Sequence, residues 1–176
     1  MTIKEDFLSL GKRARSGTKF TQKVCLIIIH WIGPYIQRIT TPRDWWENGR
    51  DGLGVQASAH FIVRDNDVLQ CLPLDEIGWH SGDTRNYTSI GIEMCPESLD
   101  GKLSIASILT LKKLIANIRT IYPDAAIERH FDGVQKKDCP RYYTPVIDLV
   151  GVDGRVPNPE GGDARWEQLK SFLNKE

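Results

Sequence analysis

The sequence lacks several features that would place the protein in a special class. Its 176 residues contain no apolar run close to the ~20 residues that a membrane-spanning helix needs. Basic and acidic side chains number 23 each, and the zero net charge argues against a broad grip on nucleic acid or an anionic membrane. The first residues lack the apolar stretch of a secretory signal. We therefore expect synthesis in the cytoplasm, no nucleic-acid partner and no membrane insertion.

Cysteine is scarce, and none of the four forms a C-x-x-C pair. Without a secretory signal we expect reduced thiols. Cys25, Cys71 and Cys95 stand in apolar stretches and are predicted to be small core side chains. Cys139 stands in the polar, proline-marked segment KKDCP, so a thiol there needs another explanation.

The rest of the composition, 40% apolar and 26% charged, is that of an ordinary globular protein. We expect one domain over 1–176, with an N-terminal arm at 1–20. Apolar patterns predict strands at 24–29, 58–64, 67–72 and 89–95, the middle two forming a hairpin. TTPRDWWENG predicts a short helix with Thr41 at its N-cap.

The longest predicted helix begins after Ser104, which can cap it, and ends before Pro123. Its apolar side chains recur at the helical period: Ile105, Ile108, Leu109, Leu111, Leu114, Ile115, Ile118 and Ile121. A loop at 150–164 and a terminal helix at 165–174 follow. Interspersed strands and helices predict an α/β (α+β-like) fold with a mixed central sheet flanked by helices.

The chain holds four histidines, and a single one of them is more often structural than functional. Together, however, His30, His130 and Cys139 could supply two nitrogens and one sulfur to a zinc ion, leaving a fourth position for water. One hundred residues separate the two histidines, so spacing alone makes this a weak hypothesis.

Several segments occur in an order that is more specific than any one of them: HWIG (30–33), SAHFIV (58–63), GWHSGD (78–83), SIGIE (89–93), RHFD (129–132) and KKDCP (136–140). This set resembles the zinc-dependent N-acetylmuramoyl-L-alanine amidase family of phage endolysins, bacterial autolysins, phage lysozyme-amidases and peptidoglycan recognition proteins. The resemblance covers roughly residues 20 to 145. It implies that family's fold, a mixed central sheet flanked by helices.

The resemblance implies that His30, His130 and Cys139 bind Zn²⁺. The cysteine favours a working enzyme, because non-catalytic recognition proteins of this kind commonly lack it. Glu93 is our candidate general base: it shares a strand face with Gly91, and a carboxylate inside a strand is costly to bury without a partner.

The resemblance also suggests groups that contact the substrate. Lys137 would stabilise the oxyanion of a tetrahedral intermediate, and His80 would donate a hydrogen bond to substrate. The tryptophans are core residues by default, but Trp31 and Trp79 adjoin proposed site residues and could line the groove.

Two positions qualify the likeness. Ala59 stands where the phage lysozyme-amidases carry a catalytic tyrosine, which shifts the weight to Glu93. His60 alternates with Phe61 in a strand, so we expect a core histidine or one that supports a ligand.

The expected activity is zinc-dependent hydrolysis of the amide between N-acetylmuramic acid and L-alanine in peptidoglycan, by a monomer of phage or prophage origin that acts on the wall after release at lysis. The main alternative is a non-catalytic peptidoglycan-binding module. A closed structural zinc site would need a fourth ligand, such as His80 or Asp138.

Overall fold

The computed structural model describes residues 2–33, 38–49, 51–146 and 158–175. Their strands form one sheet in the order β1-β4-β3-β5-β2-β6. The strands are β1 (Thr2–Glu5), β2 (Leu26–Trp31), β3 (Phe61–Arg64), β4 (Asp67–Gln70), β5 (Ser89–Met94) and β6 (Ala126–Arg129). β3 and β4 form the antiparallel hairpin, and every other neighbouring pair is parallel. The predicted mixed sheet is therefore confirmed.

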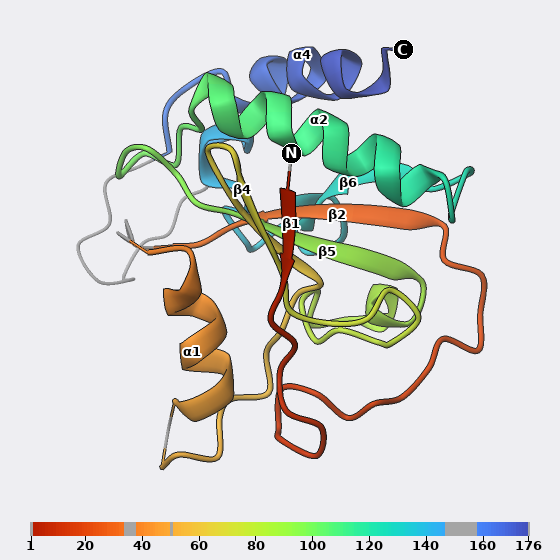
Figure 1. Cartoon of the computed structure of the whole chain (residues 1–176). Helices are drawn as coiled ribbons and strands as arrows, with labels where there is room; N and C mark the ends of the chain where they lie inside the picture. Colours follow the sequence, from red (N-terminus) through yellow and green to blue (C-terminus); the bar gives the residue numbers. More distant parts are fainter. Residues whose placement is uncertain (1, 34–37, 50, 147–157, 176) are drawn as a thin grey trace.

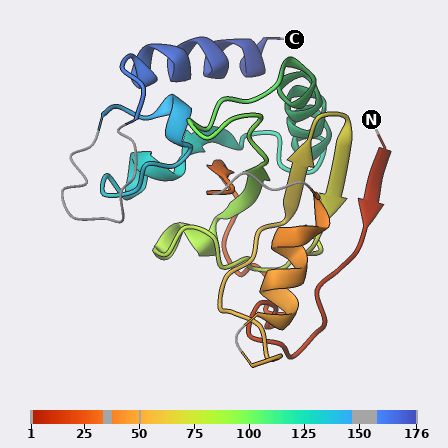
Figure 2. The same ribbon diagram turned by 90° about the vertical axis from the view of Figure 1, so that its left-hand side faces the viewer.

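The helices lie on both faces of this sheet. They are α1 (Thr40–Asn48), α2 (Ile105–Arg119), the single turn α3 (His130–Gly133) and α4 (Gly162–Asn174), with 3-10 turns η1 (Thr84–Tyr87) and η2 (Arg141–Tyr143). Figure 1 shows α2 and α4 together above the sheet, and Figure 2 shows α1 on the opposite side. Among the described residues, no helix combines the length and apolarity needed to cross a bilayer.

The two faces of β2 and β5 have different neighbours, because side chains alternate along a strand. Ile27, Ile29, Ile90 and Ile92 belong to the core beneath α2 and α4. His30 and Glu93 consequently point to the other face, where they are direct partners in the parallel register of β2 and β5. A smaller apolar cluster around Trp46, Ile62 and Leu69 lies on that side.

Helix α2 follows its sequence signals closely. The Ser104 side chain accepts a hydrogen bond from Ser107 N, as expected of an N-cap. The buried stripe contains Leu111, Leu114, Ile115 and Ile118. The predicted apolar face was too wide, however, since Ile105 is 77% exposed and Leu109 48% exposed. Both lie one turn apart on the edge of α2 that faces away from the sheet.

The N-terminal half differs from prediction in two further ways. The arm predicted at 1–20 includes strand β1, which pairs in parallel with β4 so that Thr2 stands opposite Asp67. Thr41 was wrongly predicted as the cap of α1: it lies inside the helix, and Ile39 occupies the N-cap without a side-chain hydrogen bond.

The C-terminal part also needs corrections. Strand β6 was not predicted, and α4 begins at Gly162 instead of 165. Most of the predicted loop at 150–164 lies outside the described residues. Trp166 and Leu169 of α4 are buried against the body of the protein.

The cysteines divide as follows. Cys71 and Cys95 are buried as predicted, but Cys25 is exposed because it precedes β2 at the rim of the sheet. All four are free thiols.

Candidate metal centre

His30 reaches the site from β2. The run Ile27–Ile29 is β-branched and fully buried, so it forms a central strand that fixes the direction of the next side chain. His30 is 1% exposed and lies on the face opposite α2. Burial, together with the nearby His80 and His130, lowers the pKa of His30 well below its usual value. The ring is therefore neutral, the form in which histidine binds metals.

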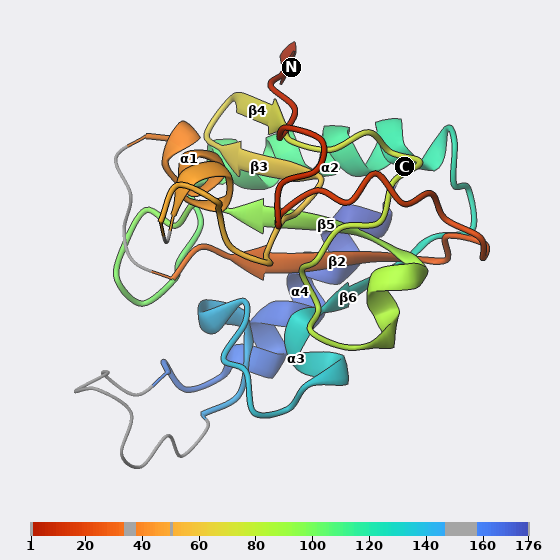
Figure 3. The same ribbon diagram turned by 90° about the horizontal axis from the view of Figure 1, so that it is seen from below.

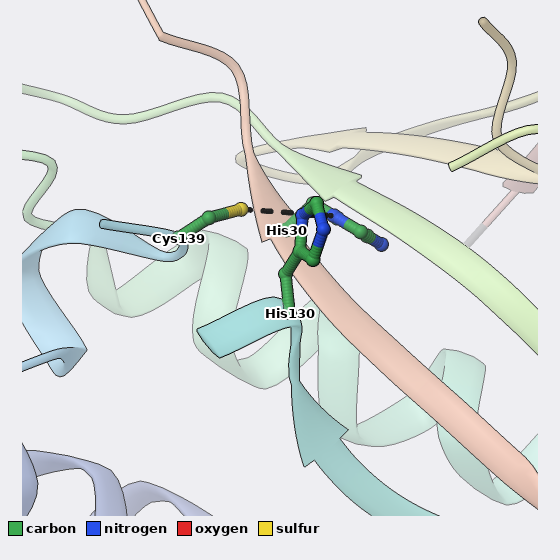
Figure 4. Close-up of side chains that lie close together, drawn as sticks. All are labelled: His30, His130 and Cys139. Atoms are coloured by element: carbon green, nitrogen blue, oxygen red, sulfur yellow. Dashed lines mark hydrogen bonds between the residues drawn. The ribbon is translucent and has the colours of Figure 1, made fainter. Parts of the chain in front are cut away.

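His130 and Cys139 come from a region folded back against β2. His130 begins α3 directly after β6, where the Asp132 side chain accepts a hydrogen bond from Arg129 N. The loop carrying Cys139 returns to this turn, since Phe131 N donates to Cys139 O at 2.9 Å. Both side chains are buried, and Figure 4 shows them converging on His30.

The distances within this cluster suit one metal ion. His30 Nδ1 lies 3.1 Å from His130 Nδ1 and 3.6 Å from Cys139 Sγ. Two nitrogens on one tetrahedral zinc are about 3.3 Å apart, and a nitrogen and a sulfur about 3.6 Å, from the usual bond lengths. His130 Nε2 donates to Ser81 O at 2.7 Å, so the lone pair of its Nδ1 faces the cluster. The residues therefore fit a zinc ion.

The ionisation of Cys139 also favours a bound cation. Burial raises the pKa of Cys139 well above its usual value, and the nearby Glu93 raises it further, while Lys137 opposes this. A thiol in these surroundings ionises only when a cation compensates it. Zn²⁺ would supply that compensation.

The geometry does not support a closed structural zinc site with four protein ligands. Within the described part of the chain, the His30, His130 and Cys139 cluster gains no fourth side chain. Asp138 instead forms an ion pair with Arg141 at 3.1 Å. His80 bonds to the outer nitrogen of His30, behind the cluster. A zinc ion held by these three side chains would keep one coordination position for water, as catalytic zinc does.

Glu93 stands beside the cluster in an unusual state. Burial raises the pKa of its carboxyl group to about 8. Its enclosed Oε2 has no hydrogen-bond partner among the described residues. Such an atom is expensive to bury, and an orphaned carboxylate oxygen next to a candidate metal site suggests a role with water or substrate.

The carboxylate opens on a hollow of about 400 Å³. Aromatic and apolar side chains form its walls, including Trp31, Pro42 and Trp45. Trp45 is 55% exposed, so the default prediction of a core residue is wrong for it, whereas Trp46 is buried. The hollow adjoins the cluster through Trp31, which follows His30 in β2.

The other predicted residues occupy several places. Lys137 is exposed. The pKa of His130 is lowered mainly by burial, and the positive charge of Lys137 lowers it further. Trp79 lies with Tyr87 in a separate hollow. His60 is a fully buried histidine whose ring nitrogens face Glu76 O and Gly91 N, as expected of a satisfied core residue. The role predicted for Lys137 stays a prediction.

Two supporting groups were not foreseen. Ser81 acts through its carbonyl oxygen, which no sequence motif displays. Arg85 donates from Nη2 to His130 O at 3.1 Å and pairs with Glu128, which ties the turn before α3 to η1. Arginines that bind backbone carbonyls across the fold leave no local pattern.

Comparison with known proteins now identifies the family. The sequence profile described as N-acetylmuramoyl-L-alanine amidase matches residues 20–142, a span that includes the metal cluster and Glu93. The chain belongs to the N-acetylmuramoyl-L-alanine amidase family. Among its relatives, N-acetylmuramoyl-L-alanine amidase XlyA of Bacillus subtilis (strain 168) is 38% identical over 105 residues, 55% of this chain and 34% of XlyA. N-acetylmuramoyl-L-alanine amidase CwlH of the same organism is 28% identical over 160 residues, 80% of this chain and 56% of CwlH.

Solved structures with other sequences share the fold. The catalytic domain of XlyA superposes with a TM-score of 0.69 at 21% identity, covering 99% of this chain and 100% of that domain. A mutant endolysin from Bacillus subtilis gives a TM-score of 0.70 at 23% identity, covering 98% and 99%. The chain spans about a third of XlyA and just over half of CwlH.

Proposed function

We propose that this chain is a zinc-dependent N-acetylmuramoyl-L-alanine amidase that cleaves the amide between N-acetylmuramic acid and L-alanine in peptidoglycan. The observation that carries the proposal is the three-ligand cluster beside Glu93, whose carboxylate opens on an aromatic hollow. Membership of the family and the names of XlyA and CwlH support the substrate.

Each group has a part in the proposed reaction. His30, His130 and Cys139 would hold the ion. When bound, zinc supplies a Lewis acid that polarises the amide carbonyl and acidifies water. Glu93 accepts the proton of the attacking water and returns it to the amine as the carbon–nitrogen bond breaks.

The charge of a zinc ion would also change the state of Glu93. A carboxyl group with a pKa of about 8 is mostly protonated at neutral pH and is then no base. A nearby dication favours the ionised form. Glu93 therefore becomes a competent base only in the loaded site.

Substrate contacts would come from the groove. Trp31 lines the hollow beside Glu93, and Lys137 would place a positive charge near the developing oxyanion. Trp79 would contact substrate only if it extends to the second hollow. The proposal gives His80 no substrate contact, because both of its ring nitrogens lie against protein groups.

The proposed function extends to the origin of the enzyme, its place of action and its oligomeric state. We expect a lytic enzyme of phage or prophage origin that acts on the bacterial wall as a monomer. The similar structure described as a mutant endolysin supports the lytic role. Light scattering of the purified chain checks the monomer.

The experiment digests purified peptidoglycan and scores new N-terminal alanine and new reducing sugars in parallel. We expect new alanine amino groups without reducing ends, lost with a chelator and restored by zinc. Glu93→Gln should retain zinc and lose at least about 100-fold in rate, the usual scale of general acid–base catalysis. Glu97→Gln, which changes an exposed glutamate, is the matched control. Wall binding without cleavage by the wild type would indicate a recognition module and overturn the proposal.

A further inference from the structure

His80 contacts His30 on the side of the imidazole ring that faces away from His130 and Cys139. Its Nδ1 is 3.0 Å from His30 Nε2, and the two rings meet edge to face at 84°. The ring of His80 rests directly on Gly91, where an added Cβ would lie 2.5 Å from His80 Cγ. Any larger residue at position 91 would displace the ring, so Gly91 makes this contact between His30 and His80 possible.

Beyond His80 the hydrogen bonds continue into the protein. His80 Nε2 lies 3.4 Å from Ser89 Oγ, and Ser89 Oγ lies 2.5 Å from Arg85 O. Ser89 is fully buried, so water does not compete for its hydroxyl group. The chain of hydrogen bonds therefore ends at a backbone carbonyl, which can only accept.

That carbonyl fixes the direction of every bond in the chain. Ser89 has a single proton and donates it to Arg85 O, so its oxygen is left to accept from His80 Nε2. A neutral His80 with its proton on Nε2 has a bare Nδ1, which accepts from His30 Nε2. His30 then carries its proton on Nε2, and its Nδ1 lone pair faces His130 and Cys139.

We infer that His80 and Ser89 are positioning residues that hold His30 in the tautomer able to bind metal. The inference rests on the proposed function for its purpose, although the tautomer itself does not depend on it. With the opposite polarity, His30 would carry a proton on Nδ1, 3.1 Å from His130 Nδ1, and that proton would occupy the metal's place. Ser81 O does the corresponding task for His130.

The first test observes the tautomer directly in metal-free protein, by nitrogen-15 NMR of the imidazole rings. The wild type should show His30 protonated on Nε2 and bare on Nδ1. His80→Asn should preserve this state, because the Asn oxygen takes the place of Nδ1 and still accepts. His80→Leu has a similar shape without an acceptor and should show a mixture of tautomers. A wild-type His30 protonated on Nδ1 would overturn the inference.

The second test measures zinc affinity by competition with a chelator of known affinity. Removal of an outer partner of a metal-bound histidine typically weakens binding 10- to 100-fold. We expect a loss of about that size in His80→Leu, a smaller loss in Ser89→Ala, and recovery in His80→Asn. Ser107→Ala removes an equally buried hydroxyl group in α2, away from the site, and is the control.

The outcomes separate this inference from the proposed function. Equal zinc affinity in wild type, Ser89→Ala and His80→Leu would overturn the positioning role even if the enzyme cleaves peptidoglycan. The predicted tautomer pattern in a protein that cleaves nothing would overturn the amidase proposal alone. If His80→Leu does not fold, the comparison of Ser89→Ala with Ser107→Ala decides the matter by itself.

Discussion

At the scale of single residues, Glu93 is the clearest case of a buried group that lowers the stability of the fold. Its neighbour in the register, His30, is neutral, and its Oε2 has no partner among the described residues. A buried carboxyl oxygen that contributed to stability would accept a hydrogen bond, because an unsatisfied buried polar atom lowers the stability of the fold by about 1–3 kcal/mol. The sequence already suggested this, since a Glu between Ile92 and Met94 has no local reason to be there.

The raised pKa of Glu93 gives a prediction for metal-free protein. Between pH 4.5, the ordinary pKa of a glutamate, and about 8, the unfolded state has lost the proton that the folded state keeps. Glu93 therefore makes the folded state less stable as pH rises through this window. We expect Glu93→Gln to gain about 1–3 kcal/mol relative to wild type between pH 5 and pH 8.

Urea denaturation with a chelator present, at both pH values, checks this difference. The buried histidines act in the opposite direction, because their lowered pKa values remove stability as pH falls below 6.5. They are common to both proteins, and Glu93 is not among the groups that shift the pKa of His30 or His60, so their contribution is the same in both. If the difference in free energy of unfolding between Glu93→Gln and wild type is the same at pH 5 and pH 8, Glu93 does not have a raised pKa in the folded state.

At the scale of elements, local sequence signals predicted those helices and strands that are stabilised by interactions within the element itself. Helix α2 was predictable because Ser104 and the buried stripe act within the helix itself. Strands β1 and β6 were not, because each has four residues and exists through pairing with a distant partner. Ile105 shows the limit of periodicity, which finds an apolar face but not how much of it the sheet covers.

Helix α4 provides the prediction at this scale. Gly162 is buried at its start, and an added Cβ would lie 1.7 Å from Thr144 O. We expect Gly162→Ala to lower the melting temperature more than Ala164→Gly, although alanine is the better helix former by about 1 kcal/mol. Thermal unfolding followed by circular dichroism measures both. A stabilised Gly162→Ala protein would show that α4 does not need this close approach.

At the scale of the whole molecule, the candidate metal centre joins segments that are remote in sequence. β2 carries His30, while His130 and Cys139 follow β6, and Figure 3 shows these segments meeting at one edge of the sheet. The pairing of β2 with β6 brings them together. The ligand set could be proposed from the family resemblance, but no spacing rule could supply it, because the contact is tertiary.

The prediction here is that zinc stabilises the whole fold. A ligand that binds only the folded state adds about 2.7 kcal/mol at 100 times its Kd. We expect a chelator to lower the melting temperature and zinc to restore it. Cys25→Ser, which changes an exposed cysteine, should behave as wild type, whereas Cys139→Ala should lose most of the response. An equal zinc response in Cys139→Ala would exclude Cys139 as a ligand.

The separation of 100 positions between His30 and His130 also bears on the order of events in folding. Closing so long a loop is entropically costly. The pairing of β2 with β6 brings the two imidazoles together in the fold, so we expect an ion to bind both of them only after that pairing. We therefore expect zinc to bind a nearly folded molecule and to form interactions that the folding transition state lacks. Added zinc should then slow unfolding and leave the rate of folding nearly unchanged. An ion acting in this way would prolong the lifetime of the native state without taking part in its formation.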